Sequence, residues 1–137
     1  GHGVVKVASK LEENGIDMLA TGSFEDAVSI RNAGIKTRIE MFGGALPEAM
    51  PKFLEYNLTP TLYSMELAES LSKLASRPTN VHIKIDFGLG RIGVPSSEGI
   101  SFIELYPTIP LVTKRLSNER LRFFLVFFAS NGSPIPR

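Results

Sequence analysis

The stretch from Ile16 to Gly34, IDMLATGSFEDAVSIRNAG, contains one strand, one loop and one helix in succession. The run from Ile16 to Thr21 is short and mostly apolar, as expected for a strand that is covered on both faces. Ser23 and Asp26 form an N-terminal capping pattern for the helix that follows, and Gly34 stops that helix. We therefore predict one β/α unit here.

The same order of elements recurs along the chain. A helix from Val4 to Leu11 precedes the quoted unit, and Gly15 caps it. We predict further strands at Arg38–Phe42, Leu58–Leu62 and Val81–Asp86, and helices from Pro47 (kinked or divided at Pro51), over Met65–Ala75 and from near Glu98. Such alternation predicts parallel strands with right-handed crossover helices, in an open doubly wound sheet or a closed barrel. An eight-stranded (β/α) barrel typically takes about 250 residues, so a barrel here is partial, roughly the first half.

The overall charge excludes some partners. The 137 residues carry 15 Lys and Arg against 14 Asp and Glu, a net charge of +1, so we expect no nucleic acid and no membrane as partner. The chain has no cysteine, no signal peptide and no apolar run long enough to span a bilayer, and we expect a cytoplasmic protein. Because it opens on Gly1 without a Met, we expect a fragment or a processed product.

The balance of charge changes along the sequence. Residues 1–105 hold ten basic and thirteen acidic side chains (net −3), whereas residues 106–137 hold five and one (net +4). We predict a barrel fragment over 1–105 and a divergent, or out-of-frame, tail over 106–137. The apolar run in this tail, FFLVFF, is either a buried strand or an aggregation hazard if it is exposed.

Three glycines, Gly88, Gly90 and Gly93, spell G-x-G-x-x-G, which in dinucleotide-binding folds holds a pyrophosphate. That site requires a helix starting within the motif and an acidic residue about 20 residues further on. Here Val94 and Pro95 follow the third glycine, and no acidic residue lies near Thr113. A nicotinamide site is thus a minor alternative, and a plain glycine-rich turn is the simpler interpretation.

Charged side chains accompany these glycines. Lys84 and Asp86 lie on the predicted strand, on the same side of it, and Arg91 follows in the loop. Catalytic groups of β/α folds gather at the carboxyl ends of the strands. An arginine there suits a carboxylate, a phosphate or a phenolate, since it offers two parallel hydrogen bonds. The alternative is a solvated surface ion pair worth about 0 to 1 kcal/mol.

The stretch VHIKIDFGLGRIGV resembles a strand and loop of alanine racemases, K-[IVM]-D-T-G-M-G-R-L-G-V. Gly1-His2-Gly3 is similar to the end of that family's K-A-N-A-Y-G-H-G segment, and GIDMLATGSFEDAVSIRNAGI resembles the unit that follows it. The matches occur in order from Gly1 to about Leu105. Phe87 and Leu89 depart from the pattern, because the family usually has Thr and Met there, and this puts substrate fit in doubt.

The resemblance implies an enzyme, an amino acid racemase (an isomerase) with pyridoxal phosphate as cofactor and an amino acid as substrate. Its family function is the interconversion of L- and D-alanine, which supplies D-alanine for peptidoglycan. It also implies an N-terminal (β/α)8 TIM-type barrel, a C-terminal β domain and a homodimer. The alternatives that we keep are a non-catalytic pyridoxal-phosphate-binding barrel protein and the nicotinamide-binding oxidoreductase.

The resemblance also assigns individual residues. Arg91 matches the family arginine beside the phenolic oxygen of the cofactor and the substrate carboxylate. Lys84 matches a lysine that is often carbamylated, and Asp86, Gly88 and Gly90 support the same loop.

In the family setting His2 is expected near the cofactor site, whereas in this chain it is expected to be exposed and inert. His82 is expected to be a core or barrel residue whose ring nitrogens have hydrogen-bond partners. Two histidines without paired acidic ligands predict no metal site. The Schiff-base lysine and the second base, a tyrosine, fall outside the chain, so we expect it to be inactive alone.

Overall fold

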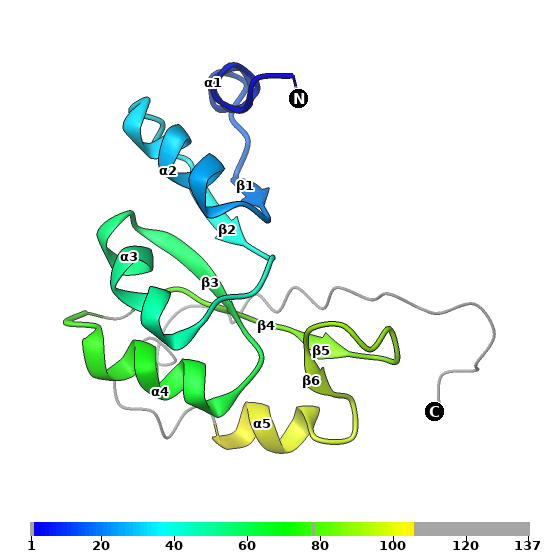
Figure 1. Cartoon of the computed structure of the whole chain (residues 1–137). Helices are drawn as coiled ribbons and strands as arrows, with labels where there is room; N and C mark the ends of the chain where they lie inside the picture. Colours follow the sequence, from blue (N-terminus) through cyan, green and yellow to red (C-terminus); the bar gives the residue numbers. More distant parts are fainter. Residues whose placement is uncertain (1, 78, 106–137) are drawn as a thin grey trace.

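A computed structural model of the protein describes residues 2–77 and 79–105 (Figure 1). Helices and strands alternate along these residues. The order is α1 (Val4–Glu13), β1 (Met18–Thr21), α2 (Phe24–Asn32), β2 (Arg38–Met41), the 3-10 helix η1 (Pro47–Ala49), α3 (Met50–Glu55), β3 (Leu58–Leu62), α4 (Met65–Leu74), β4 (His82–Ile83), β5 (Ile85–Asp86), β6 (Val94–Pro95) and α5 (Gly99–Leu105).

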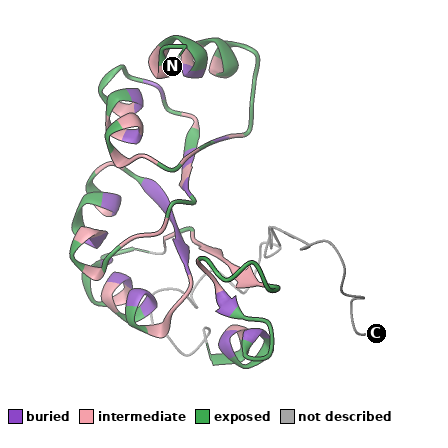
Figure 2. Cartoon of the chain, turned by 45° about the vertical axis from the view of Figure 1, so that its right-hand side comes forward, coloured by how far each residue is buried: buried purple, intermediate pink, exposed green. Residues whose placement is uncertain are grey.

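Four strands form one parallel sheet in the order β1-β2-β3-β4. The strands are neighbours in the order in which they occur along the chain, and α1 together with the intervening helices α2 to α4 lies along the outer, convex side (Figure 2). A doubly wound sheet carries helices on both faces, whereas a (β/α) barrel carries them on one. The sheet is therefore part of a barrel wall.

The core lies between the sheet and its helices. Side chains that point outward from the strands, such as Leu19, Ile39 and Leu62, are buried against buried residues of the helices. The helical contribution includes Ala8, Ala27, Ile30, Met50, Phe53, Leu67, Ala68 and Leu71. Burial of this apolar layer is the main force that holds the units together.

The structure matches most of the predicted elements, including the division of the helix at Pro51, and differs in the last predicted strand. Pro51 divides the helical segment that begins at Pro47, because a 3-10 turn precedes α3 and the proline occupies its first turn, where no N–H is needed. The predicted strand Val81–Asp86 is interrupted at Lys84, whose N–H bonds to Leu62 and whose carbonyl accepts from Val94. The chain after the glycine loop thus folds back as β6, parallel to β5.

Arg31 joins the loops that enter β2 and β3. Its Nε donates to the carbonyl of Tyr56 (2.9 Å), and its Nη1 donates to the carbonyls of Ile35 and Thr37, each at 2.8 Å. Nη2 donates to the carbonyl of Asn57 at 3.2 Å. Asn57 has a positive φ of 49°, a backbone conformation that is uncommon for non-glycine residues but that asparagine adopts more readily than most, and the guanidinium binds its carbonyl.

Glu12, near the end of α1, binds the backbone of the segment that enters β2. Its Oε1 accepts from the backbone N–H groups of Lys36 and Thr37, both at 2.7 Å, and from the Thr37 hydroxyl at 2.9 Å. The hydrogen bonds from Thr37 lower the pKa of the Glu12 carboxyl, and the one from Lys36 lowers it further. Side chains of α1 and α2 therefore satisfy the backbone groups that lead into the next strands.

We expect Arg31→Ala to lower the free energy of unfolding by about 2 to 4 kcal/mol, because four carbonyls lose a charged donor at once. Urea denaturation of the chain measures this change. Arg31→Lys should recover only part of the loss, since an ammonium lacks the planar fork. The matched control is Arg77→Ala at an exposed position; an equal effect of both alanine variants would contradict the role of Arg31.

Candidate functional site

The carboxyl ends of the strands bring three loops together. Gly22 follows β1, Gly43 and Gly44 follow β2, and Arg91 belongs to the loop between β5 and β6. The first two loops touch closely, because a Cβ added at Gly43 would lie 2.6 Å from the carbonyl oxygen of Gly22. Only glycine permits this approach, which closes the surface between β1 and β2.

Asp86 organises the loop that carries Arg91. Its Oδ1 accepts hydrogen bonds from the N–H groups of Gly88 (2.9 Å) and Leu89 (2.8 Å), and its Oδ2 accepts from Gly90 (2.8 Å). One carboxylate therefore satisfies three successive backbone donors. The two glycines at positive φ let the chain turn tightly enough for all three to point at it.

These contacts change the acidity of Asp86. The N–H of Gly88 lowers the pKa of the Asp86 carboxyl most strongly; partial burial opposes this, and the N–H groups of Leu89, Gly90 and Arg91 lower it further. Asp86 was expected to form part of a charged cluster with Lys84 and Arg91. The structure directs its carboxylate to backbone amides of the loop.

Arg91 is exposed at this edge of the barrel. Among the residues that the structure describes, its guanidinium has no ion-pair or hydrogen-bond partner. A guanidinium held on an ordered loop, with its donors unused by these residues, can bind a carboxylate or a phenolate through two parallel hydrogen bonds. This arrangement fits the anionic groups of pyridoxal phosphate and of an amino acid.

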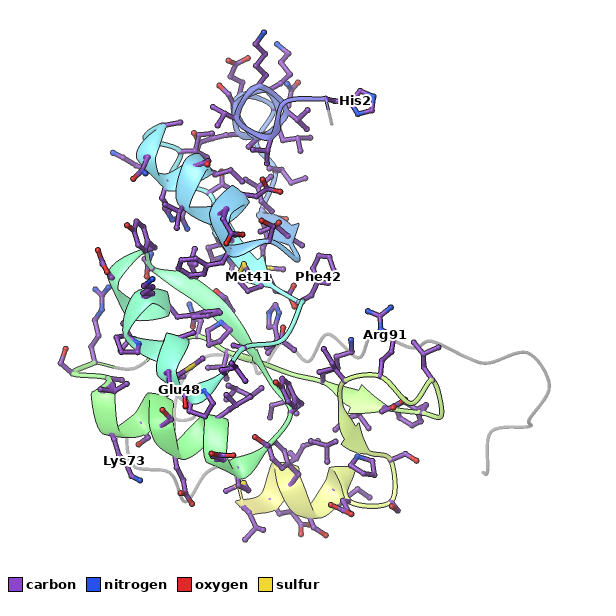
Figure 3. The ribbon with its side chains drawn as sticks, viewed as in Figure 1. His2, Met41, Phe42, Glu48, Lys73 and Arg91 are labelled. Atoms are coloured by element: carbon purple, nitrogen blue, oxygen red, sulfur yellow. The ribbon has the colours of Figure 1, made fainter. Side chains whose placement is uncertain are left out.

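The other two predicted site residues, Lys84 and His2, differ in how far they lie from the Arg91 loop. Lys84 is half-buried at the junction of β4 and β5, on the strand that leads into the loop. His2 is exposed before α1 and lies well apart from Arg91 (Figure 3). The structure thus brings Asp86, Gly88, Gly90 and Arg91 into one loop, and it does not bring His2 to them.

The concave face of the sheet carries a polar pair that the sequence analysis did not find. Nδ1 of His82 on β4 lies 2.6 Å from Oε1 of Glu40 on β2, and both side chains are largely buried. The hydroxyl of Thr61, on the strand between them, donates to the same carboxylate oxygen at 3.4 Å. The signal in the sequence is Glu40 itself, a single acid between Ile39 and Met41, but its partner follows only from strand order and register.

Exposed apolar side chains lie on the same loop as the arginine or on the neighbouring loop after β2. Phe42 follows β2 with 45% of its surface exposed, and it projects toward the same side of the molecule as Arg91 (Figure 3). Phe87 and Leu89, the two departures from the family pattern, are exposed on the glycine loop. These loops therefore carry one exposed cation together with exposed apolar side chains. Across the described part of the chain, no three His, Asp or Glu side chains gather as metal ligands.

Comparison with known proteins agrees with this class of barrel. Residues 1–129 match the family described as "Alanine racemase, N-terminal domain". The alanine racemase of Halothermothrix orenii is 37% identical over 133 residues, which are 95% of this chain and 33% of that protein. Alanine racemase 1 of Caldanaerobacter subterraneus subsp. tengcongensis is 41% identical over 96 residues, which are 68% of this chain and 25% of that protein.

Solved structures give the same result. An alanine racemase of Clostridium difficile 630 superposes with a TM-score of 0.76 at 31% identity, covering 81% of this chain and 30% of that one. A histidine racemase from Leuconostoc mesenteroides, at 22% identity and a TM-score of 0.66, shares the fold. The fold is thus part of a (β/α)8 TIM-type barrel, and the chain belongs to the alanine racemase family. It spans about a third of the length of the curated relatives that it matches.

The family match passes Leu105 and ends at residue 129. Residues 106–137 lie outside the described residues, so the division of the chain at Leu105 and the proposed tail stay predictions. Within the described part, no helix has the length and apolar character needed to cross a membrane.

We expect the carboxyl carbon of Asp86 to titrate, in an NMR pH series, below the ordinary aspartate value of about 3.9. Because the folded pKa is lowered, this carboxylate stabilises the loop fully above the unfolded pKa, and the stabilisation disappears as the pH falls through the folded pKa. The amide signals of Gly88, Leu89 and Gly90 should shift in the same step. Titration at or above the value measured in urea-unfolded chain would show that the contacts do not form.

Proposed function

We propose that this chain contributes the cofactor-facing wall of a pyridoxal-phosphate-dependent racemase that interconverts L- and D-alanine. The observation that carries the proposal is the exposed guanidinium of Arg91 on a loop ordered by Asp86, at the carboxyl ends of barrel strands. Membership of the alanine racemase family supports it. Arg91 would bind the phenolic oxygen of the cofactor and the carboxylate of the substrate.

In this proposal, the residues of this chain bind the cofactor and the substrate and orient them. When bound, pyridoxal phosphate supplies the electron sink that makes the α-proton of an amino acid removable. Arg91 would bind the anionic groups of cofactor and substrate through its guanidinium donors. Asp86 would hold the backbone of the Arg91 loop through the N–H groups of Gly88 and Gly90.

Lys84 and His2 are proposed to act in support. A carbamylated Lys84 carries a negative charge and would orient Arg91, and Lys84 lies on the strand that leads to the Arg91 loop. His2, which precedes α1, matches the histidine at the end of the family segment that holds the cofactor lysine, and it would lie near the residues that contact the cofactor.

The two groups that move the proton, a lysine and a tyrosine, belong to family segments outside this chain. We therefore propose that the chain alone does not racemise alanine, that the complete enzyme is a cytoplasmic homodimer, and that its D-alanine serves peptidoglycan. The resemblance to the family supports these points.

Two alternative functions can be distinguished from the proposed racemase. A non-catalytic pyridoxal-phosphate-binding barrel protein would bind the cofactor without racemising alanine. The nicotinamide alternative requires a helix at the third glycine, whereas Gly93 leads into β6 and α5 begins only at Gly99. The geometry of the loop therefore argues against a pyrophosphate site.

The direct test measures D-alanine formed from L-alanine and pyridoxal phosphate by the protein as its gene encodes it. Arg91→Ala should lower kcat/KM by about 100- to 1000-fold, because the substrate carboxylate loses a bidentate partner. Arg77→Ala, distant from the loop, is the control and should leave the rate unchanged. Cofactor binding without racemisation would favour the non-catalytic alternative.

A second test uses the 137-residue chain by itself. We expect no D-alanine from it at any concentration of pyridoxal phosphate, because no residue of the chain matches the cofactor-bearing lysine. Turnover by the isolated chain that disappears with Lys84→Arg would refute this assignment and would place the reactive lysine on the barrel strand.

A further inference from the structure

The end of β3 is tied to the segment that leaves β2. Tyr63 follows β3, and its phenolic O–H donates to the carbonyl of Ala45 at a distance of 2.8 Å. Both groups are partly buried against the core. The hydrogen bond therefore fixes the position of the segment 43–46 relative to the sheet.

This segment supports the loop of Arg91. Gly44 has a φ of +82°, and a Cβ added to it would lie 3.0 Å from Cδ1 of Ile92 and 3.6 Å from the hydroxyl of Tyr63. Ile92, the residue after Arg91, thus packs against the backbone that Tyr63 holds. One apolar pocket of about 400 Å³ is lined by Gly22, Gly43, Gly44, Ala45, Tyr63 and Ile92, so all three loops meet at this point.

The loop is consequently anchored on both sides of Arg91. Asp86 binds the N–H groups of Gly88 to Gly90 before it, and the contact of Ile92 with Gly44 and Tyr63 fixes it afterwards. A guanidinium that binds a carboxylate through two parallel bonds depends on its orientation. A shift of about 1 Å at such a group is enough to lower catalysis strongly.

We propose that Tyr63 is a positioning residue of this racemase. Its hydroxyl holds the segment 43–46, this segment seats Ile92, and Ile92 fixes the direction of the Arg91 guanidinium. The inference rests on the proposed function for its catalytic consequence, whereas the coupling between the two loops rests on the contacts alone.

The kinetic test compares Tyr63→Phe with the unaltered gene product. We expect the KM for alanine to rise about 3- to 10-fold, the size expected for one neutral hydrogen bond, with a smaller change in kcat. Tyr56→Phe is the matched control, because it removes a hydroxyl from the helical layer and should alter neither constant. A fall in kcat with an unchanged KM would indicate only lost active protein and would overturn the proposal.

Hydrogen exchange in the absence of substrate provides an independent measurement. In Tyr63→Phe the amides of 88–93 should exchange faster, although the lost bond lies in a different loop. Gly44→Ala should have the same effect by displacing Ile92. Unchanged exchange in both variants would refute the coupling. If the unaltered protein lacks racemase activity, the proposed function fails, and the exchange result still decides whether Tyr63 holds the Arg91 loop.

Discussion

The parallel hydrogen-bond ladder from β1 to β4 is the constraint on which the other features depend. Parallel strands end at one edge, so the loops after β1 and β2 meet there, and β5, which follows β4 directly after Lys84, brings its loop to the same point. Arg31 and Glu12 satisfy backbone groups at the opposite ends of these strands. Stability and chemistry are thus placed on different faces, as is usual for (β/α) barrels.

The strand and helix pattern predicted most of the fold, because each unit carries its own apolar run and capping residues. The periodicity left open whether the sheet was doubly wound or part of a barrel, since it does not reveal on which face a helix packs; the resemblance to alanine racemases predicted the barrel, and the structure and its neighbours confirm it. The pattern missed β6, whose two residues are too few for a periodic signal. The interruption at Lys84 was missed for a related reason, because it depends on bonds to Leu62 and Val94.

The site was predictable only in part. The motif placed Asp86, Gly88, Gly90 and Arg91 in one loop, and local hydrogen bonds account for this proximity. The role of Asp86 as an acceptor for backbone amides was not predicted, because a motif does not state which group a carboxylate faces. Contacts such as Tyr63 with Ala45, or Glu40 with His82, join residues from different units, so they required the strand order and register.

The pair Glu40–His82 has a consequence for assembly. It lies on the concave face of a sheet that forms only part of a barrel, next to Thr61. Enclosing this face would replace water by a medium of lower dielectric constant. In such a medium the attraction between opposite charges is stronger, and a buried charge without a partner costs more free energy. Loss of one partner, Glu40 or His82, would therefore cost more in a closed barrel than in this open part of the wall.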